Sequence, residues 1–217
     1  MRRVAVGDDP HAPLRILCLG AHSDDIEIGA GGTILRLLEE RPGSTVRWVV
    51  FSADDQREAE ARASAAAFLS DAASTDVAVH RFAENHFPDA WAAIKREVAQ
   101  LGQEAPPDLV LTHRRDDLHQ DHRILGELAW NTFRDHLLLE YEIPKYEGDL
   151  GHPNLFVPLS ATTATRKVEL LMAHFGTQRH RGWFRPQTFD GLMALRAVEC
   201  NAPEGAAEAF HARKLTM

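Results

Sequence analysis

Residues 14–40, LRILCLGAHSDDIEIGAGGTILRLLEE, decide the class of fold. The stretch opens on a short, mainly apolar run, Leu14–Leu19, that ends at a glycine, which is typical of a buried strand. From residue 28 onward the apolar side chains follow helical spacing until Pro42 and Gly43 stop the pattern. A strand followed at once by a helix is the repeating unit of α/β proteins, so the chain is predicted to open on such a unit.

The same alternation continues through the following hundred residues. Further strands are expected at 46–51, 77–82 and 109–112, and helices at 54–69, 91–101 and 119–136. Strands and helices that alternate in units of about 30 residues predict a mostly parallel sheet with helices on both faces. The expected fold class is therefore α/β.

The last third of the chain is less regular. Helices are expected at 162–175 and 187–198, and a closing strand at 206–216. Residues 141–158 carry three prolines and two glycines around short apolar segments. A long segment without regular structure is usually functional in a compact domain, so we expect it to form a lid and a wall of the ligand pocket.

Composition limits the other possibilities. A length of 217 residues predicts one domain over residues 1–217, with residues 1–13 as a loose N-terminal arm. Lys and Arg number 24 against 32 Asp and Glu, a net charge of −8, so neither nucleic acid nor an anionic membrane is expected as a partner. No apolar stretch reaches membrane-span length and the first residues lack the apolar core of a signal peptide, which predicts a cytoplasmic protein.

A dense polar cluster follows the first strand. Within six residues the chain places His22, Asp24, Asp25 and Glu27 at a strand end, where ligands bind in open α/β sheets. Carboxylates packed together are costly unless a positive charge neutralises them, and imidazole with carboxylate suits a zinc ion. The alternative is a polar turn in which Asp24 or Asp25 caps the next helix. The glycines that follow do not form a G-x-G-x-x-G fingerprint, so we interpret them as sites of close packing and reject a dinucleotide loop.

A second cluster, HRRDDLHQDH at residues 113–122, follows the strand expected at 109–112. His119 and His122 lie three residues apart, so on a helix they are neighbours. One can ligate a metal while the other reaches the substrate, and Asp121 between them can orient an imidazole. A solvated helix start explains each of these residues singly, but it does not explain two His/Asp clusters at two strand ends.

Together the clusters resemble the motifs of a known family. Residues 22–27, HSDDIE, resemble the A-H-P-D-D-x-E motif of the LmbE-like (PIG-L) zinc deacetylases, and residues 119–122, HQDH, resemble their H-P-D-H motif. Members of that family hydrolyse N-acyl groups of amino sugars on a Rossmann-like fold, which implies the same fold and activity here over about residues 14 to 215. Both motif prolines are replaced, by Ser23 and Gln120, but neither proline is a ligand.

The resemblance also implies a role for each residue. The residues that would ligate the zinc ion are His22, Asp25 and His122. Ferrous iron would fit the same set of two histidines and one aspartate. Asp24 would be the general base, His119 would polarise or protonate the tetrahedral intermediate, and Asp121 would tune His119 or His122. Water activated by the zinc ion would then attack the carbonyl carbon of a linear C–N amide bond.

Substrate contacts are expected from two further places. Within residues 178–185, QRHRGWFR, Trp183 can stack on a sugar ring and Arg181 can meet a phosphate or carboxylate, although a turn with its aromatic residues in the core fits equally well. Arg57 and Glu60 resemble a family Arg-x-x-Glu pattern in which the arginine approaches the substrate, and a surface ion pair is the alternative.

Three functions are left open by these residues. The first is a metal-dependent N-deacetylase that acts on an amino sugar or a related small metabolite. The second is a zinc hydrolase of the same fold that cleaves a non-sugar amide, an ester or a carbamoyl group. The third is a catalytically silent binding module, which would require a broken ligand set or base, whereas every position is intact. The expected partner is a small-molecule substrate, and a homo-oligomer is left open.

Overall fold

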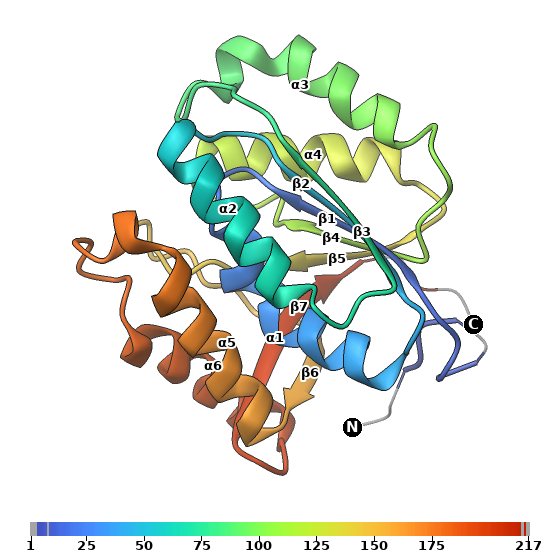
Figure 1. Ribbon diagram of the computed structural model, residues 1–217, viewed down its shortest axis with the longest axis vertical. Helices are drawn as coiled ribbons and strands as arrows, with labels where there is room; N and C mark the ends of the chain where they lie inside the picture. Colours follow the sequence, from blue (N-terminus) through green and yellow to red (C-terminus); the bar gives the residue numbers. More distant parts are fainter. Residues whose placement is uncertain (1–3, 8, 214, 216–217) are drawn as a thin grey trace.

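The structure, a computed structural model, describes residues 4–7, 9–213 and 215 (Figure 1). Its centre is a seven-stranded sheet with the strand order β3-β2-β1-β4-β5-β7-β6. The strands are β1 (Arg15–Gly20), β2 (Thr45–Val50), β3 (Ser74–Val79), β4 (Leu109–His113), β5 (Leu137–Tyr141), β6 (Leu155–Leu159) and β7 (Ala206–Ala212). The helices are α1 (Asp25–Glu40), α2 (Asp55–Phe68), α3 (Phe87–Leu101), α4 (Gln120–Thr132), α5 (Ala161–His174), α6 (Pro186–Cys200) and the short 3-10 helix η1 (Gly176–Gln178).

Most of the sheet is parallel. β3, β2, β1, β4 and β5 run in one direction, and β7 is inserted antiparallel between β5 and β6. β1 lies near the middle, where Ile16 is paired with Val46 of β2 on one side and Leu109 of β4 on the other. The predicted α/β architecture with a mostly parallel sheet is confirmed.

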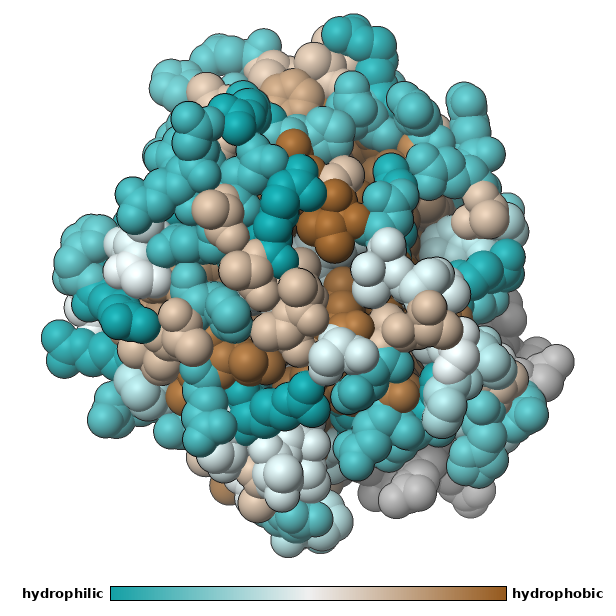
Figure 2. All heavy atoms as spheres, in the orientation of Figure 1, coloured by the Kyte–Doolittle hydropathy of each residue, from teal (hydrophilic) through white to brown (hydrophobic). Residues whose placement is uncertain are grey.

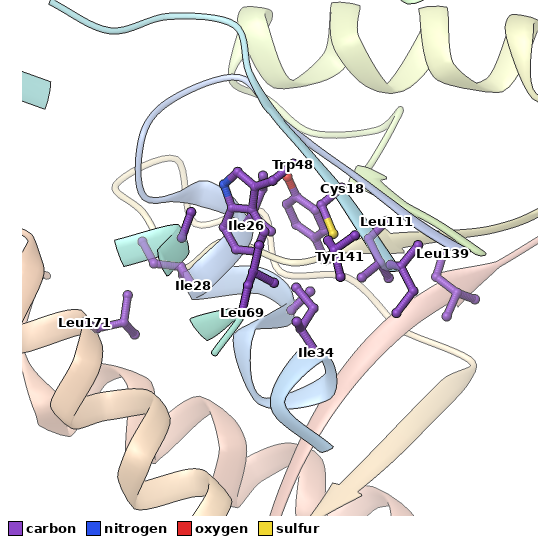
Figure 3. Packing of buried hydrophobic residues seen from close by; sticks show 14 of the residues in the cluster. Cys18, Ile26, Ile28, Ile34, Trp48, Leu69, Leu111, Leu139, Tyr141 and Leu171 are labelled. Carbon is purple, nitrogen blue, oxygen red and sulfur yellow. The ribbon is translucent and has the colours of Figure 1, made fainter. Parts of the chain in front are cut away.

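Helices cover both faces of this sheet (Figure 1). Successive residues of β1 point to opposite faces: Ile16 and Cys18 enter one apolar core, and Leu17 and Leu19 enter the other. The first core lies under α1, α2, α5 and α6, and Figure 3 shows Trp48 and other buried side chains packed within it. The second lies under α3 and α4. Because both faces are buried, the central strands read as nearly continuous apolar runs.

Two glycines of α1 allow this helix to approach its neighbours closely. A Cβ atom on Gly29 would overlap the ring of Tyr141, and one on Gly31 would overlap the ring of Phe68. The phenol of Tyr141 donates a hydrogen bond to the backbone oxygen of Leu19 at 2.6 Å, which keeps its ring in that place. The interpretation of these glycines as packing positions, and not as a nucleotide loop, is therefore supported by the geometry.

Two strands were not expected from the sequence. The helix expected at 119–136 ends at Thr132, and Leu137–Tyr141 form β5, which pairs with β4. Residues Leu155–Leu159, the end of the expected irregular segment and one residue beyond it, form β6, which pairs with β7. Both strands are only five residues long, and the partner β7 lies about fifty or more residues further along the chain, so neither pairing leaves a local signal.

Part of the expected N-terminal arm is bonded to Arg41. The buried guanidinium of Arg41 donates hydrogen bonds to the backbone oxygens of Val6, Asp9 and Ala12. These bonds attach part of the arm to the domain, and its looseness stays a prediction; residues 1–3 and 8 lie outside the described residues. At the other end the closing strand stops at Ala212, and positions 214 and 216 of its expected range are also not described.

Among the described residues, no helix has both the length and the apolar character needed to span a membrane. On the face shown in Figure 2, polar side chains cover most of the area and apolar side chains gather toward its middle.

Candidate metal centre and active site

The two His/Asp clusters meet at the carboxyl ends of β1 and β4. These strands are direct neighbours in the sheet, so the turn after β1 and the loop after β4 lie side by side. His22 belongs to the first of these connections, Asp25 begins α1, and His122 lies in the first turn of α4. The carboxyl ends of parallel strands share one edge, which is why two sequence motifs about a hundred residues apart form one site.

Side-chain atoms of three residues converge at this edge. Nδ1 of His22 lies 3.1 Å from Nε2 of His122 and 3.3 Å from a carboxylate oxygen of Asp25. The other carboxylate oxygen of Asp25 lies 3.5 Å from Nε2 of His122. Zinc bonds to nitrogen and oxygen measure about 2.0–2.2 Å, and a tetrahedron of that size has edges of about 3.3–3.6 Å. The nearest atoms of His22, Asp25 and His122 lie close to these edge lengths, with a different oxygen of Asp25 facing each histidine. Among the described residues, two sets of three could each hold a metal ion with one ligand atom per residue: His22, His119 and His122, and Asp25, His113 and His122.

In His22 and in His122, the ring nitrogen that faces away from the convergence point lies close to a carboxylate. Nε2 of His22 lies 3.1 Å from Asp121, and Nδ1 of His122 lies 3.2 Å from Asp117. When each of these nitrogens donates to its carboxylate, the opposite nitrogen keeps its lone pair and faces the convergence point. The structure thus corrects one expected role, because the Asp121 side chain contacts His22 and not His119 or His122.

The electrostatics of the cluster favour a bound cation. Although burial opposes protonation, the carboxylates of Asp25 and Asp121 raise the pKa of His22 to about 10. Burial, together with the neighbouring His113, lowers the pKa of His122 to about 3. A divalent cation at this place would balance the negative charge of these carboxylates.

Asp24 directly precedes α1, but its side chain does not cap the helix. It occupies the position before the helix, but its side chain makes no capping hydrogen bond. Instead it accepts a hydrogen bond from Nη2 of Arg57 at 2.7 Å. The alternative of a simple helix cap is therefore not what the structure shows for Asp24. Burial raises the pKa of this carboxyl, although Arg57 acts in the opposite direction.

Arg57 belongs to the site and not to the surface. Its side chain is 15% exposed, and it also donates to Oγ1 of Thr177 at 3.2 Å. Glu60 lies 3.8 Å from Arg57 and accepts hydrogen bonds from the backbone and the hydroxyl of Thr177. The expected alternative of a surface ion pair is wrong, because α2 presents both residues to η1 beside Asp24.

His119 stands at the edge of the same cluster, half-buried. Its ring stacks on the ring of His122 at 4.5 Å between centroids and meets the ring of His22 edge-on at 5.0 Å. Its Nδ1 accepts a hydrogen bond from the backbone N–H of Asp121 at 3.3 Å. That bond leaves Nε2 to carry the ring hydrogen. Burial, followed by His22, lowers the pKa of His119, so its ring is a neutral donor.

Three supporting residues were missed by the sequence reasoning. His113 is fully buried, with Nε2 3.1 Å from Asp25 and its ring stacked on His122 at 3.9 Å between centroids. Asp117 holds His122 and is itself paired with Lys145 at 3.0 Å. His113 was visible as a histidine at a strand end, whereas Lys145 comes from a segment without a pattern.

The segment expected to form a lid lies beside the loop after β4, whereas the segment expected to stack on a sugar packs against the first core. Residues 142–154 run next to the loop after β4, where Asp149 accepts the backbone N–H of Leu118 at 2.8 Å. Trp183 is partly buried against the first core, beside Phe184, while the backbone of Arg181 bonds to Gln178. Contacts among the described residues do not join Trp183 or Arg181 to the metal cluster, and their role in binding substrate stays a prediction.

Comparisons with known proteins agree with this geometry. The family model for PIG-L, GlcNAc-PI de-N-acetylase, matches residues 17–133, a little over half of the chain, and this span contains both clusters. No curated protein sequence matches the chain.

Solved structures share the fold. The N,N′-diacetylchitobiose deacetylase from Pyrococcus horikoshii has a TM-score of 0.70 at 18% identity, over 92% of this chain and 83% of the other. The 4-carboxy-2-hydroxymuconate hydratase from Pseudomonas putida KT2440 has a TM-score of 0.73 at 19% identity, over 94% and 98%. The zinc-inhibited form of a teicoplanin deacetylase has a TM-score of 0.67 at 16% identity, over 93% and 100%.

At these identities the structural likeness shows a common fold and nothing about the reaction, since a hydratase shares the fold with deacetylases. The match to the family model is stronger evidence than the structural likeness. It spans the strands and loops that position the two clusters, which include His22, Asp24, Asp25, His119 and His122. This chain belongs to the PIG-L (GlcNAc-PI de-N-acetylase) family.

Proposed function

We propose that this protein is a zinc-dependent hydrolase that removes an N-acyl group, N-acetyl in the simplest case, from an amino sugar or a related small metabolite. The observation that carries the proposal is the convergence of His22, Asp25 and His122, whose nearest nitrogen and oxygen atoms lie 3.1–3.5 Å apart, next to the carboxylate of Asp24. Family membership supports an amide bond as the target.

The residues that would hold the ion are His22, Asp25 and His122. Two histidines and one carboxylate suit zinc, and ferrous iron is the alternative metal for the same set. A zinc ion with three protein ligands acts as a Lewis acid toward a carbonyl group and makes water easier to deprotonate. The chain prepares this set in advance, because Asp121 and Asp117 orient the imidazoles and the backbone N–H of His22 donates to Asp25 at 2.6 Å.

Asp24 is the residue that we propose as general base. It is adjacent in sequence to the ligand Asp25, and Arg57 orients its carboxylate from the other side. Because burial raises its pKa, this carboxylate takes a proton more readily than an ordinary aspartate does. An attacking water placed between Asp24 and the carbonyl carbon would lose its proton to Asp24.

His119 is proposed to stabilise the tetrahedral intermediate. Its Nε2–H is free to donate because Nδ1 accepts from the backbone of Asp121. A neutral imidazole donor at this place can hydrogen-bond to the developing oxyanion. Protonated Asp24 then gives the proton that it took from water to the departing amine nitrogen, and the C–N bond breaks.

The proposal is tested by metal reconstitution and an assay for released amine. Purified protein is stripped with a chelator, reloaded with Zn²⁺ or Fe²⁺, and incubated with N-acetylglucosamine and with N,N′-diacetylchitobiose. We expect amine release that depends on metal and is lost in His122→Ala, whose metal content falls as well. Zinc-loaded protein that releases no amine from any N-acylated sugar in a broad panel would refute the function.

Substrate profiling separates the rival functions. Hydrolysis of an ester or a non-sugar amide in preference to every amino sugar would favour the second hydrolase reading. Retention of zinc without turnover of amides, esters or carbamoyl compounds would favour a binding module.

A further inference from the structure

The connection between β3 and α3, residues 80–86, is bonded to a buried carboxylate beside the metal cluster. The side chain of Asp121 has no exposed surface, and one of its oxygens lies 3.1 Å from Nε2 of His22. The same oxygen accepts the backbone N–H of Asn85 at 2.7 Å, and the other oxygen accepts the backbone N–H of Phe87 at 3.2 Å. The carboxylate that orients His22 is therefore itself held by backbone groups at the start of α3.

Asn85 is bonded to the first turn of α4 through both of its backbone polar groups. Its N–H donates to Asp121, and its carbonyl oxygen accepts a hydrogen bond from the side-chain amide of Gln120. Its φ of 66° lies in the left-handed region, which asparagine and glycine enter more readily than other residues do. In this conformation the N–H and the carbonyl oxygen of one residue both reach α4, so the connection is attached there at two points.

Gln120 stands where the H-P-D-H motif has proline. A proline has no side-chain donor, so it could not make the bond that Gln120 makes to the carbonyl oxygen of Asn85. The departure from the motif thus supplies a contact between α4 and the connection after β3. Because Asn85 also donates to Asp121, this contact bears on the carboxylate that orients His22.

Little apolar burial holds this part of the connection in place. Residues 83–86 are exposed, whereas Phe87, which begins α3, is fully buried with its ring 6.1 Å from the ring of His22 between centroids. A stretch with few buried contacts depends on its hydrogen bonds for its position. Loosening the bonds to α4 should therefore displace Asn85 from Asp121 without unfolding the domain.

We propose that Gln120 and Asn85 are positioning residues for the metal centre. Together they hold residues 83–86 against α4, which keeps the N–H of Asn85 on the carboxylate of Asp121. That carboxylate holds Nε2 of His22, so that Nδ1 is directed at the place of the ion. The proposal rests on the proposed function, since it takes His22 as a metal ligand. Both residues act through Asp121, and neither is assigned a contact with the ion or the substrate.

The test measures zinc affinity by competition with a chromophoric chelator, which needs no turnover. Gln120→Met keeps the length of the side chain but cannot donate, so zinc affinity should fall by about threefold to tenfold. That is less than the roughly 10–100-fold expected when the partner of a ligand is itself changed. Asn85→Val should cause a similar loss, because a β-branched residue resists the left-handed conformation. Asn85→Gly should retain nearly all of the affinity, because glycine adopts that conformation freely.

A double-mutant cycle separates action through Asp121 from a general effect on the fold. In protein that carries Asp121→Ala, the substitutions Gln120→Met and Asn85→Val should cause no further loss of zinc affinity, because the carboxylate through which they act is gone. The matched control is Gln100→Met, since Gln100 is exposed at the opposite end of α3 from Phe87. It should leave zinc affinity unchanged. Circular dichroism melting shows that each variant is folded.

The outcomes separate this proposal from the function on which it rests. The positioning role is overturned if Gln120→Met and Asn85→Val bind zinc as tightly as the unsubstituted protein, or lose the same factor when Asp121→Ala is present. It is also overturned if Asn85→Gly loses as much affinity as Asn85→Val. In these cases metal-dependent release of amine would leave the deacylase function standing.

The reverse result is equally distinct. If the variants lose zinc affinity as expected but the zinc-loaded protein releases no amine from N-acylated sugars, the positioning role stands and the proposed function fails. If the unsubstituted protein binds no zinc, both fail.

Discussion

Exchanging each of the adjacent aspartates for asparagine, one at a time, separates the base from the metal ligand. Asp24→Asn keeps the size of the side chain, and its amide oxygen can still accept the hydrogen bond that Arg57 now donates at 2.7 Å. The amide cannot accept a proton, so kcat should fall by about 10²–10⁴-fold, which is about 3–5 kcal/mol of transition-state stabilisation. Zinc affinity should fall by no more than about 10–100-fold, because an outer-shell group has been changed.

Asp25→Asn should affect the metal first. The carboxylate of Asp25 accepts the backbone N–H of His22 at 2.6 Å, so an asparagine would turn its oxygen to that donor. Its NH₂ group would then stand where the other oxygen lies 3.5 Å from Nε2 of His122. An N–H that donates to this nitrogen occupies the lone pair that the metal needs. The substitution thus removes one ligand and blocks another, and zinc affinity should fall by more than the 100-fold expected for an outer-shell change.

Two measurements on each variant decide the assignment. Competition with a chromophoric chelator gives the zinc affinity, and amine release at saturating zinc gives kcat. Circular dichroism melting checks that both variants fold. The reasoning is refuted if Asp24→Asn protein is metal-free while Asp25→Asn protein retains its ion.

Three further predictions concern residues around the site and the core. Asp121→Asn should weaken zinc binding by about 10–100-fold, because it loosens the hydrogen bond to Nε2 of His22, and the same chelator competition would contradict this if the affinity were unchanged. Lys167→Met should lower the free energy of unfolding by about 3–5 kcal/mol, because it leaves the carboxylate of Glu208 buried without its partner at 2.6 Å. Urea denaturation measures that loss, and adding Glu208→Gln should recover part of it. Gly29→Ala should cost about 1–3 kcal/mol, because the added methyl group overlaps a ring that is fixed by its hydrogen bond, and a melting temperature equal to that of the unsubstituted protein would contradict this.

The first half of the fold was predictable because its pattern is local. Leu14–Leu19 and the following helix show the strand and helix periods within one stretch of sequence, and glycine or proline marks most of the boundaries. β5 shows no such boundary, since LLLEY continues the apolar character of the preceding helix. It becomes a strand because Leu109 of β4 pairs with Leu137 and Ala212 of β7 pairs with Leu139. Pairing partners so far apart in the chain cannot be read from a local pattern.

The same distinction applies to the site. His22, Asp25 and His122 stand in short motifs, so their sequence positions were sufficient to predict that they meet. Which carboxylate binds each imidazole was harder to predict from the sequence. Asp121 lies nearer in the chain to His122, but its side chain contacts His22. Only the register of β1 against β4 and the start of α4 determine which carboxylate reaches which ring.

Chemistry and substrate choice come from different parts of this chain. The residues proposed to hold the metal and move protons lie between His22 and His122, within the span that matches the family model. Thr177, which bonds to Arg57, lies beyond residue 133, where that match ends. Family membership therefore bears on the reaction but does not define this outer part of the site. Changes at Thr177 should alter which amide is hydrolysed more than they alter zinc binding, because its side chain bonds to Arg57 and Glu60 and not to a proposed zinc ligand.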